Sequence, residues 1–208
     1  MSLKLNSSGG GSVTLQEPTT ASDVTLSLPA ANTTIVGTDA TQTLTNKTIQ
    51  GGAVTSGTAV ASTSGTAIDF TSIPSWVKRI TVMFSGVSTS GSSNYQVQIG
   101  SGSVTTSGYA CGFSFVSSGA ATANATSGFV VANPSSAAVV FSGILTIALV
   151  SSNTWVSSHV MGETDAARAM LGGGTSPSLG GTLDRVRITT VNGTDTFDAG
   201  TINILYEG

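Results

Sequence analysis

The feature that most constrains this chain is a long stretch without any charged residue. No Asp, Glu, Lys or Arg occurs between Arg79 and Glu163, and only 8% of the whole chain is charged, against about 25% in soluble globular proteins. A disordered stretch of this length would normally carry charge or proline to stay in solution. This one alternates apolar with small polar residues. It is therefore predicted to fold, with a surface of Ser, Thr, Asn and Gln.

Apolar residues recur at every second position here, as in a β-strand with one buried and one solvated face. The pattern is clearest in residues 95–99, where Gln96 and Gln98 are expected to face water. Further strands are predicted, in chain order, at residues 80–85, 109–116, 128–132, 139–150, 154–161, 185–189 and 201–207.

Turn residues separate these runs, and Asn192-Gly193 is the strongest hairpin signal among them. Residues that build long helices are too few for a helical protein. The sequence therefore predicts an all-β fold, in which residues 66–208 form a jelly-roll-like β-sandwich. Residues 51–65 are small and flexible in composition and are predicted to be a linker.

Charge and hydropathy argue against several classes of function. With a net charge of −3 and seven basic residues, the chain has too little positive surface for nucleic acid. The longest apolar run, residues 137–150, is broken by polar residues and is shorter than the roughly 20 residues of a membrane-spanning helix. No hydrophobic stretch typical of a secretory signal is found near the N-terminus. We expect neither nucleic acid binding nor membrane insertion.

Cys111 and His159 are the only residues of their kinds. A single cysteine rules out an internal disulfide, and one histidine without a carboxylate cluster gives no metal-ligand set. Cys111 lies among aromatic residues and is predicted to be buried. His159 is predicted to lie on a strand near the surface, although a Ser–His–Asp catalytic site would also need it. We expect no cofactor and no metal.

Two acidic pairs are the remaining candidates for catalysis. They are Glu163 with Asp165, and Asp195 with Asp198. Glycosidases use carboxylate pairs about 5 to 10 Å apart, and the second pair with nearby carbonyls is a weaker candidate for calcium. The favoured interpretation is that these carboxylates cap backbone N–H groups in loops.

Two glycine triplets lack the Lys-Ser/Thr of a phosphate-binding loop. They are Gly9–Gly11 and Gly172–Gly174, and both are predicted to be flexible turns.

Four aromatic residues are candidates for ligand contact: Trp76, Tyr95, Tyr109 and Trp155. Neutral sugars stack on aromatic rings while amides and hydroxyls complete the hydrogen bonds. The competing interpretation, which we prefer for the tryptophans, is that they belong to the core or to a subunit interface.

Residues 1–50 have short apolar alternations but no aromatic residue, and they cannot close a core by themselves. Burial against identical copies would shelter their apolar stripes. The residues expected in this trimerisation and attachment segment are Val13, Leu15, Val24, Leu26, Leu28, Ile35, Leu44 and Ile49.

The segment Asp39–Ile49, which reads DATQTLTNKTI, resembles an element common in bacteriophage tail-fibre and other virion fibre proteins. Residues 13–40 look like the N-terminal region of many phage structural proteins. Residues 73–88 are similar to the first core strand of small fibre or knob domains, and residues 181–208 to their end. The resemblance spans both ends of the chain and about half its length.

This resemblance implies a non-enzymatic homotrimer, assembled in the host cytoplasm as part of the virion. Its N-terminus would attach to other virion proteins of the tail or capsid, and its knob would contact a host surface glycan or protein. The alternatives are a capsid head fibre or decoration protein, and, less favoured, a glycan-degrading enzyme or a bacterial surface adhesin. A closed three-chain assembly would also bury the apolar stripes of residues 1–50.

Overall fold

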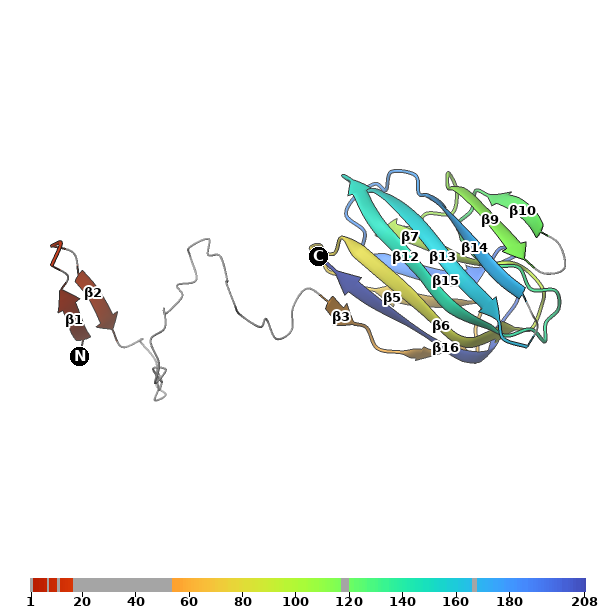
Figure 1. Cartoon of the computed structure of the whole chain (residues 1–208), viewed down its shortest axis with the longest axis horizontal. Coiled ribbons are helices and arrows are strands. Elements are labelled where there is room, and N and C mark those ends of the chain that lie inside the picture. The colour runs from red at the N-terminus through yellow and green to blue at the C-terminus, as the bar shows by residue number, and fades with distance from the viewer. Residues whose placement is uncertain (1, 7, 11, 17–53, 117–119, 166–167) are drawn as a thin grey trace. The chain divides into compact units, whose positions relative to one another are not determined.

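A computed structural model describes residues 2–6, 8–10, 12–16, 54–116, 120–165 and 168–208. Every regular element in these residues is a β-strand, and no helix among them is long and apolar enough to cross a membrane. The chain divides into two units, residues 1–48 and 49–208. In the second unit two antiparallel sheets pack as a sandwich (Figure 1). The prediction of an all-β fold with a sandwich is confirmed; we call residues 49–208 the knob.

The larger sheet of the knob has nine strands, in the order β10-β9-β14-β13-β12-β6-β16-β3, with β4 also paired to β16. In chain order these strands are β3 (Val54–Ser56), β4 (Val60–Ala61), β6 (Arg79–Thr89), β9 (Ala110–Val116), β10 (Ala120–Ala125), β12 (Phe141–Ser151), β13 (Thr154–Glu163), β14 (Arg168–Thr175) and β16 (Phe197–Glu207).

The smaller sheet has five strands, in the order β11-β7-β15-β5, with β8 paired to β7. In chain order they are β5 (Ala67–Thr71), β7 (Tyr95–Ser101), β8 (Ser103–Val104), β11 (Phe129–Ala132) and β15 (Arg185–Thr190).

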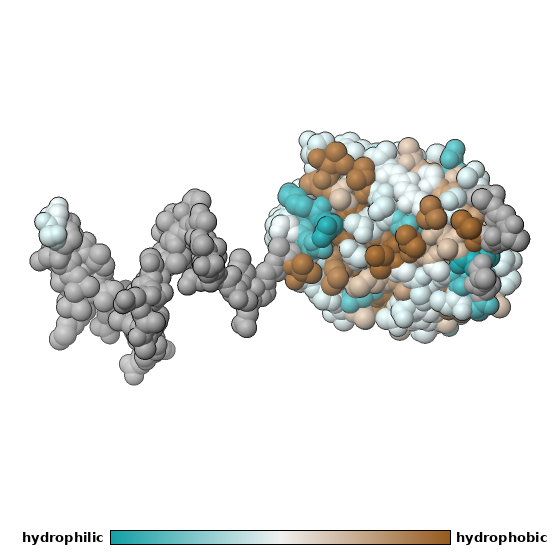
Figure 2. Space-filling view, in the orientation of Figure 1, coloured by the Kyte–Doolittle hydropathy of each residue, from teal (hydrophilic) through white to brown (hydrophobic). Residues whose placement is uncertain are grey.

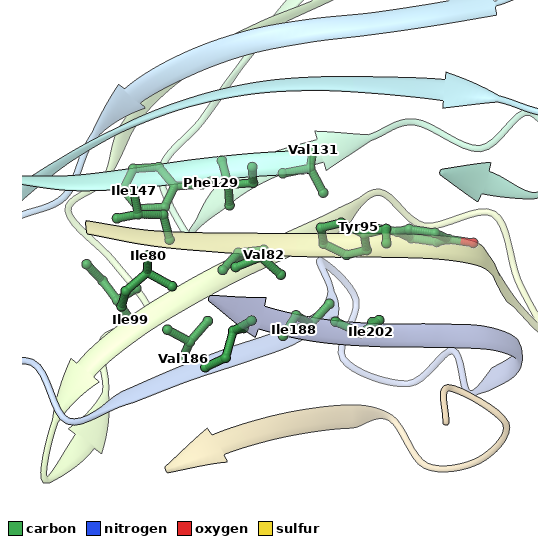
Figure 3. Close-up of a cluster of buried hydrophobic side chains, with 14 of the residues drawn as sticks. Ile80, Val82, Tyr95, Ile99, Phe129, Val131, Ile147, Val186, Ile188 and Ile202 are labelled. Atoms are coloured by element: carbon green, nitrogen blue, oxygen red, sulfur yellow. The ribbon is translucent and has the colours of Figure 1, made fainter. Parts of the chain in front are cut away.

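The core of the knob lies between the two sheets. Ile80, Val82 and Ile147 enter it from the larger sheet, and Phe129 and Val186 from the smaller one (Figure 3). All five are completely buried. The alternation of apolar residues that predicted the strands is thus the alternation that fills the space between them. This single core explains why the knob is one unit.

Aromatic rings join the two layers of the core. Tyr95 packs edge-on against Phe141 with ring centroids 5.5 Å apart, and Tyr109 packs edge-on against Phe129 at 5.0 Å. Edge-to-face pairs of this kind add about 0.5–1.5 kcal/mol beyond the area that they bury. The Tyr109 hydroxyl also accepts a hydrogen bond from the backbone N–H of Ile99 at 2.9 Å. The ring is therefore fixed within the core.

The N-terminal unit contains a hairpin of β1 (Ser2–Asn6) and β2 (Ser12–Gln16), in which Leu3 pairs with Leu15. Residues 8–10 form its turn, which includes Gly9 and Gly10 of the first glycine triplet, while Gly11 lies outside the described residues. Gly10 has a φ of 85°, in the left-handed region that glycine tolerates. Of the eight residues predicted for trimerisation, Val13 and Leu15 lie in β2. The other six lie outside the described residues: Val24, Leu26, Leu28, Ile35, Leu44 and Ile49.

The predicted linker over residues 51–65 needs correction. Residues 54–56 and 60–61 are strands that pair with β16, and the N–H of Ser62 donates to the carbonyl of Gly200 at 2.9 Å. Composition suggested flexibility because these residues have little side chain to bury. Backbone hydrogen bonds to an open sheet edge hold them instead.

The predicted wet face of residues 95–99 also needs correction. Gln96 and Gln98 are both buried, because β7 is a central strand and the turn around Ser127 covers its outer face. The Ser127 hydroxyl donates to Gln96 at 2.7 Å, and the Gln98 amide donates to the Ser127 carbonyl at 2.9 Å. The alternation correctly separates a polar from an apolar face of this strand, but a hydrogen-bonded loop covers the polar face.

Asn192-Gly193 forms a turn, with Gly193 at a φ of 69°, but the strands on either side of it do not pair with each other. β15 belongs to the smaller sheet and β16 to the larger one, so this turn carries the chain across the sandwich. The hairpin prediction was wrong because the local turn signal does not determine which strand the next one joins.

Gly172–Gly174 is a strand rather than the predicted flexible turn. The three residues lie in β14, between β13 and β9. A Cβ on Gly172 would lie 2.5 Å from the carbonyl oxygen of Gly112 and 2.6 Å from the His159 ring, and one on Gly174 would lie 2.5 Å from the carbonyl oxygen of Ala110. Glycine is needed here because the neighbouring strands leave no room for a side chain.

We expect Gly172→Ala to destabilise the protein by roughly 1–3 kcal/mol, as overpacking against backbone does. Gly180→Ala is the matched control, because a Cβ there meets nothing within 4 Å, and it should change stability by less than about 0.5 kcal/mol. Urea unfolding of both variants measures the difference. Equal stabilities would show that β14 tolerates a side chain at this position.

Candidate ligand-binding surface

Three of the four candidate aromatic residues belong to the core. Tyr95 is fully buried, and Tyr109 and Trp155 are each 2% exposed. Burial raises the pKa of each tyrosine to about 12, since the phenolate would lose its hydration. These three residues hold the sandwich together and offer no ring surface to a ligand.

Trp76 is the candidate that remains, with 44% of its surface exposed. It precedes β6 in a tight turn, in which the N–H of Val77 donates to the carbonyl of Pro74 at 3.1 Å. Val77 is buried and anchors the turn to the core. Proline fixes the backbone of this turn before the strand begins. The indole is thus exposed on a rigid support.

Tyr206 of β16 lies beside Trp76; it is half-buried, because part of it packs against the core. Its ring centroid lies 6.2 Å from that of Trp76, and the two ring planes meet at 65°. The N–H of Lys78 donates to the carbonyl of Glu207 at 2.7 Å, which ties the Trp76 turn to the last strand. Sequence reasoning missed Tyr206, although the alternation over residues 201–207 already placed it on a strand. We call Trp76 and Tyr206 the aromatic surface.

The chemistry of this pair is compatible with binding a ligand by stacking. An exposed indole next to a phenol offers an apolar ring face and a hydroxyl that can donate or accept. The Arg79–Glu207 ion pair lies nearby but points to the other face of the sheet, since Glu207 follows Tyr206 in β16. The aromatic surface is therefore suited to an uncharged ligand such as a sugar ring.

The acidic residues are engaged in structural contacts. Glu163 is buried and pairs with Arg168 at 3.0 Å. Asp165 accepts a hydrogen bond from the N–H of Val140 at 3.2 Å, and Asp195 accepts one from the N–H of Ser93 at 3.0 Å. Asp198 accepts the hydroxyl of Ser88.

These contacts favour loop and strand support over acid–base chemistry. Arg168 also lies over the Phe115 ring, 4.7 Å from its centroid, so the cation of the buried pair is held on two sides. No group of three or more potential metal-binding side chains occurs within the described ranges.

A second charged cluster lies on the smaller sheet and was not foreseen. Arg187 of β15 makes two 2.7 Å hydrogen bonds to Asp69 of β5. Arg185 donates to Asp184 at 2.8 Å, and this hydrogen bond, before the others, lowers the pKa of that carboxyl. Each of these two arginines is neutralised by a carboxylate. The hollow that they line with Ser103 is therefore not an evident anion site.

His159 lies in the core, 4% exposed, rather than near the surface as predicted. It pairs across the sheet with Leu145 and with Gly172, whose missing side chain leaves room for the imidazole. Neither ring nitrogen has a hydrogen-bond partner. Burial lowers the pKa of His159 to about 4, so the ring is neutral at pH 7.

Cys111 is buried, as predicted, and burial raises the pKa of its thiol. It lies on β9, in the same sheet as His159. The thiol is thus both shielded from solvent and kept protonated, and it acts as a small apolar residue.

Comparisons with models of protein families, with curated proteins and with solved structures found no match for this chain.

Acid should destabilise the protein through His159. Between about pH 6.5 and pH 4 the unfolded chain binds a proton at this ring while the folded chain does not, so stability falls as pH falls. Over this window the loss approaches about 3 kcal/mol, at 1.36 kcal/mol for each unit by which the pKa is lowered.

Urea unfolding of the parent and of His159→Leu at a series of pH values isolates this contribution. The variant should be at least as stable as the parent at pH 7 and should gain on it steadily toward pH 4. If the free energies of unfolding of the two proteins change in parallel with pH, burial does not lower the pKa of His159.

Proposed function

We propose that this protein is a non-enzymatic structural component of a bacteriophage virion. In this proposal it is a homotrimeric fibre, attached by its N-terminal segment and carrying a knob that contacts the host cell surface. The observation that carries the proposal is the division into two units. A knob with a complete core of its own follows a segment whose DATQTLTNKTI motif resembles that of virion fibre proteins.

The chemistry of the knob supports a binding role. Its surface is dominated by hydroxyl and amide groups, with few charges, and the described carboxylates and arginines are largely paired with each other or with backbone. A surface of this kind makes little long-range field and suits neutral, hydroxyl-rich partners. The aromatic surface of Trp76 and Tyr206 is the part that we assign to a host glycan.

A capsid head fibre or decoration protein is the alternative, and one observation favours it. Trp76 lies at the end of the sandwich where the chain enters the knob, since Tyr206 pairs with Thr55 of β3. An aromatic surface at that end also suits contact with a neighbouring virion protein. Immunogold labelling of virions with an antibody against the knob distinguishes label on the tail from label on the head.

Light scattering of the full chain should give three times the 20.6 kDa chain mass, because residues 1–50 cannot bury their apolar stripes alone. Leu26→Asp with Leu28→Asp should lower this mass, since it places charge in the stripe. Thr25→Asp with Ser27→Asp adds the same charge between the stripe positions and is the control. A monomeric parent at micromolar concentration would falsify the trimer.

Trp76→Ala should weaken binding to an array of neutral oligosaccharides by at least tenfold. Truncation of an aromatic anchor typically costs about 2 kcal/mol, and each 1.4 kcal/mol is a factor of ten. Val191→Ala, at a similarly exposed apolar position, should bind like the parent. Unchanged binding by Trp76→Ala would remove the aromatic surface from the proposal, and release of soluble sugar fragments by the parent would favour a glycan-degrading enzyme.

A further inference from the structure

The outer face of the larger sheet carries a row of four apolar residues, of which three are exposed and Met83 is half-buried. Met83 of β6, Ile144 of β12, Val160 of β13 and Leu171 of β14 are directly paired across four neighbouring strands. Ile144 is 49% exposed, Val160 62% and Leu171 47%. Scattered apolar residues are normal on a protein surface, but a contiguous row is a sign of an interaction site.

Two further exposed valines lie on the same face but outside this row. Val156 of β13 lies four residues from Val160 on the same face, and Val116 of β9 pairs with Ala169 next to Leu171. The space-filling view shows apolar side chains in a band across this face, among pale, small polar ones (Figure 2). We call the outward-facing residues of β6, β12, β13, β14 and β9 the outer face.

The outer face is almost free of formal charge. The row next to the apolar one consists of uncharged residues paired in one register: Thr81, Thr146, Ser158, Gly173 and Gly112. On β9, β12 and β13 this follows directly from the charge-free stretch of the sequence. Arg79, at one corner, is already paired with Glu207.

We propose that the outer face is the surface through which the knob binds a second copy of itself. Identical chains carry identical charges, so a face that meets its own copy is favoured when it carries none. The hydroxyls beside the apolar row can pair with one another across such a contact. A partner of a different kind, such as a polyanion or a basic protein, would find no charge here to recognise.

The size of the outer face fits this partner. Five strands about 4.8 Å apart span roughly 24 Å, and ten residues of β13 span roughly 33 Å. The product is about 800 Å², which is the area that each partner buries in a standard stable interface. The proposal does not depend on a virion role. Because the same face is used on both sides, the contact pairs knobs two by two. In a trimer it would therefore join knobs of neighbouring trimers and raise the mass above three chains as the concentration rises.

The knob alone is the protein to test, since residues 49–208 have their own core. Sedimentation velocity should show that this fragment self-associates at micromolar concentration, and Val160→Lys should abolish the association by placing charge in the apolar row. Val191→Lys makes the same change at an exposed position outside the outer face and should associate like the parent. Because residue 160 points outward, both variants should keep the parent's unfolding midpoint within a few degrees.

A fragment that stays monomeric at all concentrations, or Val160→Lys that associates as the parent does, overturns the proposal. Labelling of the full chain with a maleimide gives a second readout. Ser158→Cys on the outer face should be protected, whereas Ser135→Cys, in an exposed loop, should react. Protection of Ser158→Cys in a full chain whose knob fragment is monomeric would show that residues 1–48 cover the face, which also overturns the proposal.

The test of the outer-face contact can fail without contradicting the proposed virion role, and the reverse also holds. Loss of knob association in Val160→Lys, with a full chain that remains trimeric, leaves the proposed function standing and assigns the outer face its own contact. A monomeric full-length parent contradicts the proposed trimer, and a monomeric knob contradicts only the outer-face contact.

Discussion

The structure depends on the burial of one apolar layer between two sheets that have almost no charge to organise them. Ile80, Val82 and Ile147 on one side meet Phe129 and Val186 on the other, and each is completely buried. Ion pairs contribute little, because most of them lie at strand ends or on exposed faces. The fold is therefore specified by alternation, by ring packing and by glycine where strands approach closely, as at Gly172 and Gly174. The binding surfaces are what this arrangement leaves exposed.

The sequence predicted strands better than it predicted their neighbours. A period of two is a local property, so the positions of β6, β9, β12 and β13 followed from the residues themselves. Sheet membership is not local. Asn192-Gly193 makes the expected turn, yet it joins strands of different sheets, and Gln96 is buried because a distant turn covers it. Likewise β3 is held by backbone hydrogen bonds, which the side-chain pattern of the sequence does not predict.

The candidate site shows the same division between local and distant information. Aromatic residues are suited to both cores and ligands, and only their place in the fold distinguishes the two. Tyr95, Tyr109 and Trp155 proved to be core, while Trp76 stayed exposed because it lies in a turn before β6. Its neighbour Tyr206 comes from the other end of the chain. The sequence pattern did not indicate the apolar row of the outer face either, because the strands that form it, β6, β12, β13 and β14, come together only in the sheet.

The attachment of β3 and β4 to β16 has a mechanical consequence. β3 pairs three residues with β16 and β4 pairs two, so few backbone pairs hold this segment against tension on the preceding chain. Detachment of β3 and β4 would free residues 54–65, whose fully extended length is roughly 40 Å at about 3.3 Å per residue. This segment could thus detach under tension while the two sheets of the sandwich stay folded.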